Sequence, residues 1–74
     1  MKADPDMYDV VCVKRAMPEH GLAAGARGTV VMDYSKEART PTYEVEFCDS
    51  DGVTIALATL AGDDLEVVWR SQDS

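Results

Sequence analysis

The sequence predicts an all-β fold, a small five-stranded SH3-like barrel with a long first loop and a short 3₁₀ turn before the last strand. Two observations predict this class. Five short segments rich in β-branched and aromatic residues are separated by turn residues, and their connections are a long first loop, a hairpin through the middle and a short last turn. An open antiparallel sheet that buries its second face by dimerising is the structural alternative.

The length of the chain allows one domain. Its 74 residues bury only about 60% of their unfolded surface on folding, which fills a single core. We expect one barrel domain over residues 7–69, a flexible N-terminal tail over residues 1–6 and a flexible C-terminal tail over residues 70–74. A core of this size stabilises the folded state by only about 3–5 kcal/mol, and self-association is one way to add stability.

The first strand and the loop after it are expected over residues 7–14 and 15–27. The strand carries apolar residues at four consecutive positions, Val10–Val13, which is typical of a strand covered on both faces. In the loop, Gly25 to Gly28 give a tight approach to the second strand, and we expect Leu22 to fill the end of the barrel.

The second and third strands are expected over residues 29–34 and 42–48, joined by a polar, exposed connection over residues 35–41. The third strand alternates between apolar and acidic residues, which predicts one buried and one exposed face. The apolar face holds Tyr43, Val45 and Phe47, and the acidic face holds Glu44 and Glu46.

The last part of the chain contains a turn at residues 49–52, a fourth strand at 53–60, a 3₁₀ turn at 60–65 and a short fifth strand at 66–69. The two faces of the fourth strand differ in side-chain size. One face holds Val53, Ile55 and Leu57, and the other holds the small residues Thr54, Ala56 and Ala58, which leave room for a closely packed neighbour.

The charge of the chain argues against nucleic acid as a partner. The net charge is -7, and all of the excess lies in residues 43–74, where eight acidic residues accompany one base, Arg70. Binding to phosphate backbones needs clustered positive charge. We also expect no membrane span and no signal peptide, because no apolar run approaches about 20 residues and the N-terminus is polar, so the expected location is cytoplasmic.

No pattern in the sequence predicts a catalytic, metal or cofactor site. His20 is the single histidine and has no nucleophile beside it, and Cys12 and Cys48 lack the spacing of metal ligands. We interpret both cysteines as small buried thiols. The run at residues 49–52 begins like a calcium loop, but position twelve of that loop is Leu60 instead of an acidic residue, so we predict a hairpin turn.

Several short motifs resemble those of a family of small bacterial proteins of unknown function, and they span residues 9–68. Members of that family are short stand-alone chains, some of them carried on mobile gene cassettes, and no enzymatic activity is attached to them. The matching stretches are Asp9-Val10-Val11, Pro18 to Leu22, Gly25, Gly28 to Val31, Tyr43 to Phe47, Asp51-Gly52 and Asp64-Leu65.

A more distant similarity is to the SH3-like half of the nitrile hydratase β subunit and its accessory proteins. Those proteins share a Gly-x-x-Gly-x-Val entry into a strand, here Gly25 to Val30, and a Tyr-x-Val-x-Phe strand, here Tyr43 to Phe47. The helical half of that subunit is missing from this chain, and so is the cysteine-rich metal motif of its partner. The similarity therefore implies a small barrel that docks on another protein, without catalysis.

We therefore expect a non-enzymatic barrel that acts through protein–protein contact as a homo-oligomer. One alternative is an accessory or neutralising subunit that docks on a specific enzyme or toxin through its acidic face, and another is an enzyme that uses His20. Trp69 either covers the barrel end or anchors a partner. The residues expected at an interface are Val10, Cys12, Met17, His20, Leu22, Ala56, Ala58 and Trp69.

Overall fold

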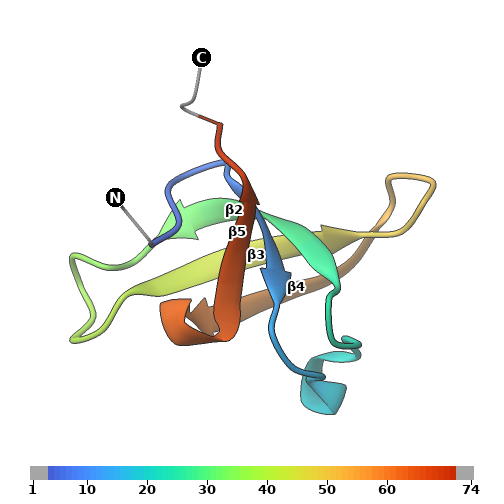
Figure 1. Ribbon diagram of the computed structural model, residues 1–74, viewed down its shortest axis with the longest axis horizontal. Helices are drawn as coiled ribbons and strands as arrows, with labels where there is room; N and C mark the ends of the chain where they lie inside the picture. Colours follow the sequence, from blue (N-terminus) through green and yellow to red (C-terminus); the bar gives the residue numbers. More distant parts are fainter. Residues whose placement is uncertain (1–3, 72–74) are drawn as a thin grey trace.

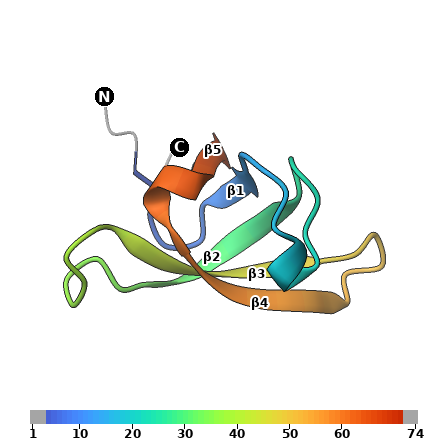
Figure 2. The same ribbon diagram turned by 90° about the horizontal axis from the view of Figure 1, so that it is seen from below.

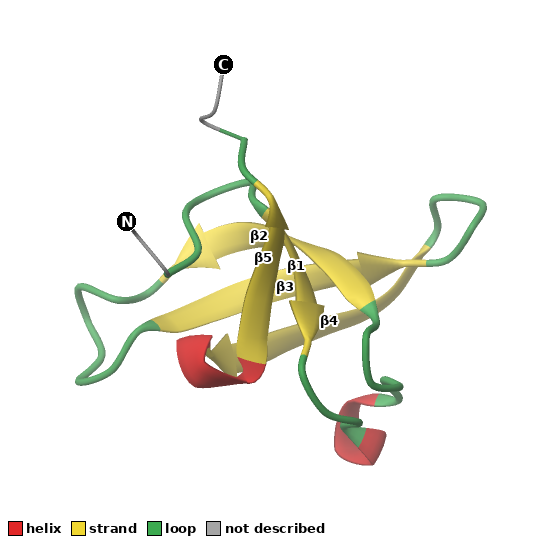
Figure 3. Ribbon diagram, in the orientation of Figure 1, coloured by secondary structure: helices red, strands yellow, loops and turns green. Residues whose placement is uncertain are grey.

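One antiparallel sheet of five strands forms the domain, in the order β4-β3-β2-β1-β5 (Figure 1). The computed structural model describes residues 4–71. Two 3₁₀ turns interrupt the chain, one in the long first loop and one directly before β5 (Figure 3). The elements are β1 (Val10–Val13), η1 (Pro18–His20), β2 (Arg27–Asp33), β3 (Thr42–Cys48), β4 (Thr54–Ala61), η2 (Gly62–Asp64) and β5 (Leu65–Trp69).

The sheet is coiled, so that β1 and β5 lie on one side of the core and β2, β3 and β4 lie on the other (Figure 2). This arrangement, with its long first loop and the 3₁₀ turn before the last strand, confirms the predicted five-stranded SH3-like barrel. β4 and β5 are the two edges of the sheet. Each pairs with a single neighbour, β3 and β1 respectively.

Every strand boundary lies within two residues of the sequence prediction except the start of β1. β3 has the predicted bounds, whereas β1 begins at Val10 instead of Met7. The reason is Tyr8, whose φ of 68° lies in the left-handed region and cannot continue an extended strand. Burial in β1 alternates, with Val11 and Val13 buried and Val10 and Cys12 partly exposed.

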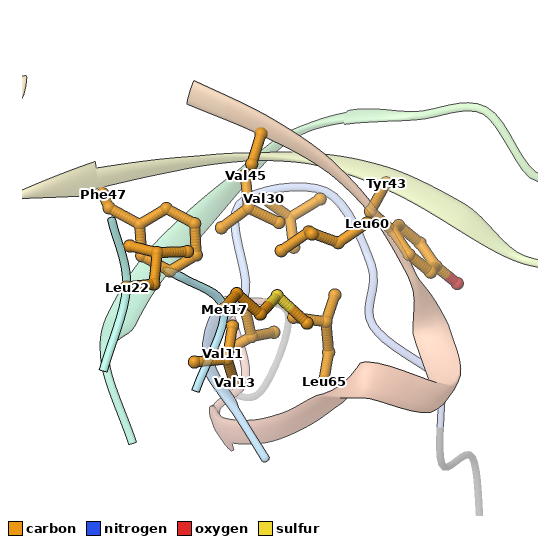
Figure 4. Close-up of a cluster of buried hydrophobic side chains, with 11 residues drawn as sticks. Val11, Val13, Met17, Leu22, Val30, Tyr43, Val45, Phe47, Leu60 and Leu65 are labelled. Atoms are coloured by element: carbon orange, nitrogen blue, oxygen red, sulfur yellow. The ribbon is translucent and has the colours of Figure 1, made fainter. Parts of the chain in front are cut away.

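The core collects side chains from all five strands and from the long loop (Figure 4). Met17 and Leu22 pair with each other through two backbone hydrogen bonds, which fold the loop so that both side chains enter the core. Leu22 is buried, as predicted. The buried apolar residues are Val11, Val13, Met17, Leu22, Val30, Tyr43, Val45, Phe47, Ala58, Leu60 and Leu65.

Gly28 allows two neighbouring strands to pack closely. It lies in β2, paired with Val11 on one side and Phe47 on the other. A Cβ atom at this position would lie 2.7 Å from Cγ1 of Val45 and 2.8 Å from the carbonyl oxygen of Glu46. A larger residue at position 28 would therefore clash with β3.

Of the tails expected at residues 1–6 and 70–74, the structure describes residues 4–6 and 70–71. Residues 1–3 and 72–74 lie outside the described residues, so those parts of the prediction are not addressed. Pro5 is buried, and the carbonyl oxygen of Asp4 accepts a hydrogen bond of 2.9 Å from Nη1 of Arg70. Residues 4–6 and 70–71 therefore pack against each other and belong to the folded domain.

Candidate interaction surface

Three large aliphatic side chains are exposed where β4 begins. Val53, Ile55 and Leu57 are 59%, 60% and 57% exposed, and we call them the β4 stripe. Scattered apolar residues on a surface are ordinary, but a contiguous group of large ones marks a contact site more often. The β4 stripe is therefore the first candidate for a functional surface.

The register between β3 and β4 explains why the large residues of β4 point outward. Phe47 lies opposite Ala56, and Val45 lies opposite Ala58, on the face that lines the core. The side chains of Phe47 and Val45 fill the volume at these two positions, so small residues fit across from them. Ala56 and Ala58 of the predicted small face therefore pack toward the core, whereas Thr54 is exposed and hydrogen-bonds to Glu46 across the register shift at Ile55.

β4 is also an edge strand without the usual protection. The eight-residue sequence Thr-Ile-Ala-Leu-Ala-Thr-Leu-Ala contains no charge, no proline and no glycine. Natural edge strands are normally prevented from pairing with other chains by charged residues, by proline or by a short length. A register shift at Ile55 is one irregularity, but residues 56–61 pair with β3 in unbroken register. This edge is suited to pairing with another strand.

Polar groups beside the β4 stripe are already engaged within the sheet. Glu46 lies opposite Leu57 and accepts a hydrogen bond from the Thr54 hydroxyl. Glu44 accepts a hydrogen bond of 2.8 Å from Tyr34 Oη. That hydrogen bond is the main reason that the pKa of Tyr34 is raised above its ordinary value of 10.0, with desolvation and the negative charge of Glu44 adding to it.

The hairpin between β3 and β4 is held by one aspartate. Asp49 Oδ1 accepts hydrogen bonds from the backbone amides of Asp51, at 2.9 Å, and of Val53, at 3.0 Å. Gly52 has a φ of 80°, which favours glycine. These contacts confirm the predicted turn.

A second polar cluster surrounds Asp9, whose side chain is buried. Its Oδ2 accepts hydrogen bonds from the Asp6 amide at 2.9 Å and from Arg70 Nη1 at 3.2 Å. Its Oδ1 accepts one from the Ser71 amide at 2.9 Å, and the Ser71 hydroxyl lies 3.2 Å from Oδ1 and 2.8 Å from the carbonyl oxygen of Met7. This Asp9 cluster joins the segment before β1 to the segment after β5.

Opposing effects set the pKa of Asp9. Burial raises it, but the hydrogen bonds from Asp6 and Ser71 and the positive charge of Arg70 lower it more. The net result is a pKa below the ordinary value of 3.8, so Asp9 is a carboxylate at neutral pH. Because its donors come from both ends of the domain, the chemical role of this group is to hold the ends together.

The residues expected at an interface fall into two groups in the structure. Met17, Leu22 and Ala58 belong to the buried core, which corrects their assignment as contact residues. The others retain exposed surface. Val10, Cys12 and Ala56 are partly exposed, and His20 and Trp69 are exposed.

The cysteines are less buried than expected. Cys48 is exposed at the end of β3, and Cys12 is partly exposed, with its Sγ 3.8 Å from Glu66 Oε1. Both are free thiols. The expectation of buried thiols is wrong for Cys48, because the alternation of β3 places position 48 on the outer face with Glu46.

Sequence reasoning named the small face of β4 and missed the β4 stripe. The signal was present, since both faces of this strand are apolar, but hydrophobicity alone does not decide which one is buried. The Asp9 cluster was also missed. A usable clue was that Arg70 is the single base of an acidic half of the chain.

Within residues 4–71, no three His, Cys, Asp or Glu side chains are arranged to hold a metal ion, and no pocket is found. The described part of the chain also contains no helix with the length and apolar character required to cross a bilayer.

Comparison with known proteins places the chain in relation to a family. The family described as Domain of unknown function (DUF4926) matches residues 7–67, which include every strand except the last two residues of β5. No curated protein and no solved structure matches the chain with significant similarity.

Proposed function

We propose that this chain, which belongs to the DUF4926 family of unknown function, acts through protein–protein contact and assembles with copies of itself. The exposure of the β4 stripe carries this proposal. These three side chains stand at alternate positions of the chain, and each is more than half exposed. The contact surface is thus the outer part of β4, in place of the long loop and small-residue face that the sequence favoured.

Burial of the β4 stripe supplies a driving force for assembly. Complete burial of a Val, Leu or Ile side chain is worth roughly 1.5–3 kcal/mol, and more than half of that remains available at each of the three positions. A domain of 74 residues has a small core, so contact between subunits adds stability where the chain needs it.

The test is the molar mass in solution, measured by light scattering over a range of concentrations. We expect the wild-type chain to show a defined multiple of 8.1 kDa, and Leu57→Glu to return the mass to 8.1 kDa without unfolding the monomer. Val68→Glu is the matched control, because Val68 is an exposed aliphatic residue on β5, the opposite edge of the sheet. A wild-type mass of 8.1 kDa at every concentration would contradict the proposal.

The second candidate function is an accessory or neutralising subunit that docks on an enzyme or toxin through its acidic face. It is supported by the charge of residues 43–74, whose single base, Arg70, lies within hydrogen-bonding distance of Asp9. The acidic side chains of this half therefore keep a net negative charge for a basic partner. Binding of such a partner should weaken as salt is raised, because exposed charge pairs are screened.

A further inference from the structure

We infer that the second copy pairs along the free edge of β4, antiparallel to it, so that two five-stranded sheets become one continuous sheet with Leu57 at the two-fold axis. This inference rests on the proposed self-assembly and specifies its geometry. It differs from a face-to-face contact, in which two copies would stack their β4 stripes without joining backbones.

The backbone of β4 provides the first argument. This strand pairs with β3 on one side, and no described strand lies on its other side (Figure 2). One row of its peptide N–H and C=O groups therefore faces solvent along eight residues. An antiparallel copy of the same strand satisfies these groups on both subunits at once, as a two-fold interface requires.

Charge is the second argument, because a chain with a net charge of -7 must avoid repulsion when it meets itself. β4 carries no charged residue, so no like charges face each other across the new pairing. The nearest carboxylate opposite Leu57 is Glu46, one strand inward. It would lie three strand spacings from its counterpart, about 14 Å, which exceeds the screening length of about 8 Å at physiological salt.

The regular part of β4 sets the register of the new pairing. Residues 56–61 pair with β3 in unbroken register, and Leu57 is the large exposed aliphatic residue of this regular stretch, so a pairing that buries it symmetrically is centred on Leu57. With Leu57 opposite Leu57 of the second copy, Ile55 lies diagonally across from that leucine, within reach of a long side chain. The four exposed aliphatic side chains then form one cluster across the axis.

Cysteine cross-linking tests this register directly. In a Cys12→Ser, Cys48→Ser background, Leu57→Cys places two thiols opposite each other across the axis, at a separation that a disulfide can span. We expect mild oxidation to yield a covalent dimer on a non-reducing gel. The control Thr59→Cys lies on the same face of β4 but would be four positions away from its counterpart along the paired strands, so it should remain uncoupled.

Hydrogen exchange on the wild-type chain gives an independent result that needs no substitution. Edge pairing predicts that amides of β4 that exchange rapidly in dilute samples become protected when the chain assembles. A face-to-face stack predicts no such protection. A chain that assembles without protecting β4, or one in which Thr59→Cys couples and Leu57→Cys does not, would overturn the inference and leave the proposed function intact.

Failure of the proposed function itself has a different signature. A molar mass of 8.1 kDa for the wild-type chain in light scattering would contradict both the self-assembly and the edge pairing. Assembly that requires a separate basic protein, and that disappears at high salt, would also overturn the self-pairing and would favour the accessory role.

Discussion

Asp9 and Leu57 occupy environments opposite to their chemistry. Asp9 is a charged residue with no exposed surface, and Leu57 is an aliphatic residue with more than half of its surface exposed. The difference between them lies in their partners. Asp9 receives hydrogen bonds from Asp6, Arg70 and Ser71, whereas the Leu57 side chain is left in solvent.

This difference distinguishes residues that stabilise the folded chain from residues whose burial can stabilise a complex. A buried carboxylate is tolerated when the protein itself supplies its donors, and it then stabilises the folded chain. An exposed aliphatic side chain contributes little to the fold that carries it, so its free energy of burial remains available for binding. Substitutions at the two sites should therefore affect different quantities.

The largest expected effect follows from removing the Asp9 carboxylate. Asp9→Ala leaves the buried donors of Asp6 and Ser71 without their acceptor and should cost on the order of 3 kcal/mol, because hydrogen bonds to charged groups are the strong ones. Urea unfolding measures this cost. Asp63→Ala, at an exposed carboxylate in η2, should change the free energy of unfolding by less than about 0.5 kcal/mol.

Leu57→Ala is the corresponding substitution at the exposed aliphatic site. At concentrations where the chain is monomeric, it should also change the free energy of unfolding by less than about 0.5 kcal/mol. If Leu57→Ala destabilised the monomer as much as Asp9→Ala does, the stripe would be part of the core, and the distinction between the two sites would be lost.

The next largest effect tests the two faces of β4. Ala58→Leu adds three carbon atoms to a position opposite Val45 in the core and should cost about 1–3 kcal/mol through overpacking. Thr59→Leu, one residue further along and exposed, should leave the stability of the monomer nearly unchanged. Equal costs at the two positions in urea unfolding would contradict the observed orientation of the strand.

The sequence predicted β3 residue by residue but could not orient β4, and the reason is physical. In β3 acidic residues alternate with aromatic and aliphatic ones, so polarity alone decides which face is buried. In β4 both faces are apolar, and the choice depends on the volume left by Phe47 and Val45 across the sheet. That volume is a property of the packed core and of strand register, which a local pattern does not contain.

Asp9 was hidden from sequence reasoning for a related reason. Its charged and hydroxyl partners, Arg70 and Ser71, lie at the other end of the chain. Before the fold is known, Asp9 looks like an ordinary polar residue at the start of a strand. The candidate contact surface and the buried carboxylate were thus both set by contacts between distant parts of the chain.

The pH dependence of stability should distinguish the Asp9 cluster from the many exposed carboxylates. Because the folded pKa of Asp9 lies below its ordinary value of 3.8, this group stabilises the fold fully above that pH. Its contribution is lost as the pH falls from 3.8 through the lower folded pKa. We therefore expect the stability difference between wild type and Asp9→Asn to be largest near neutral pH and to shrink in acid. A constant difference across this range would contradict the assignment.

The smallest expected effect concerns the polar contacts beside the β4 stripe. Tyr34→Phe removes the hydrogen bond to Glu44 and should lower stability only slightly, because both groups can turn to water. The clearer measurement is the ultraviolet titration of the tyrosines. Glu44→Gln should bring the pKa of Tyr34 down toward 10.0, since the acceptor that favours the neutral phenol loses its charge.

The sign of the Tyr34 effect on stability can be stated as well. A raised folded pKa means that the contribution is complete below pH 10.0 and is lost as the pH rises through the folded value. Alkaline unfolding should therefore differ less between wild type and Tyr34→Phe than unfolding at neutral pH does. If Glu44→Gln left the pKa of Tyr34 unchanged, the hydrogen bond to Glu44 would not be the main cause of the raised value.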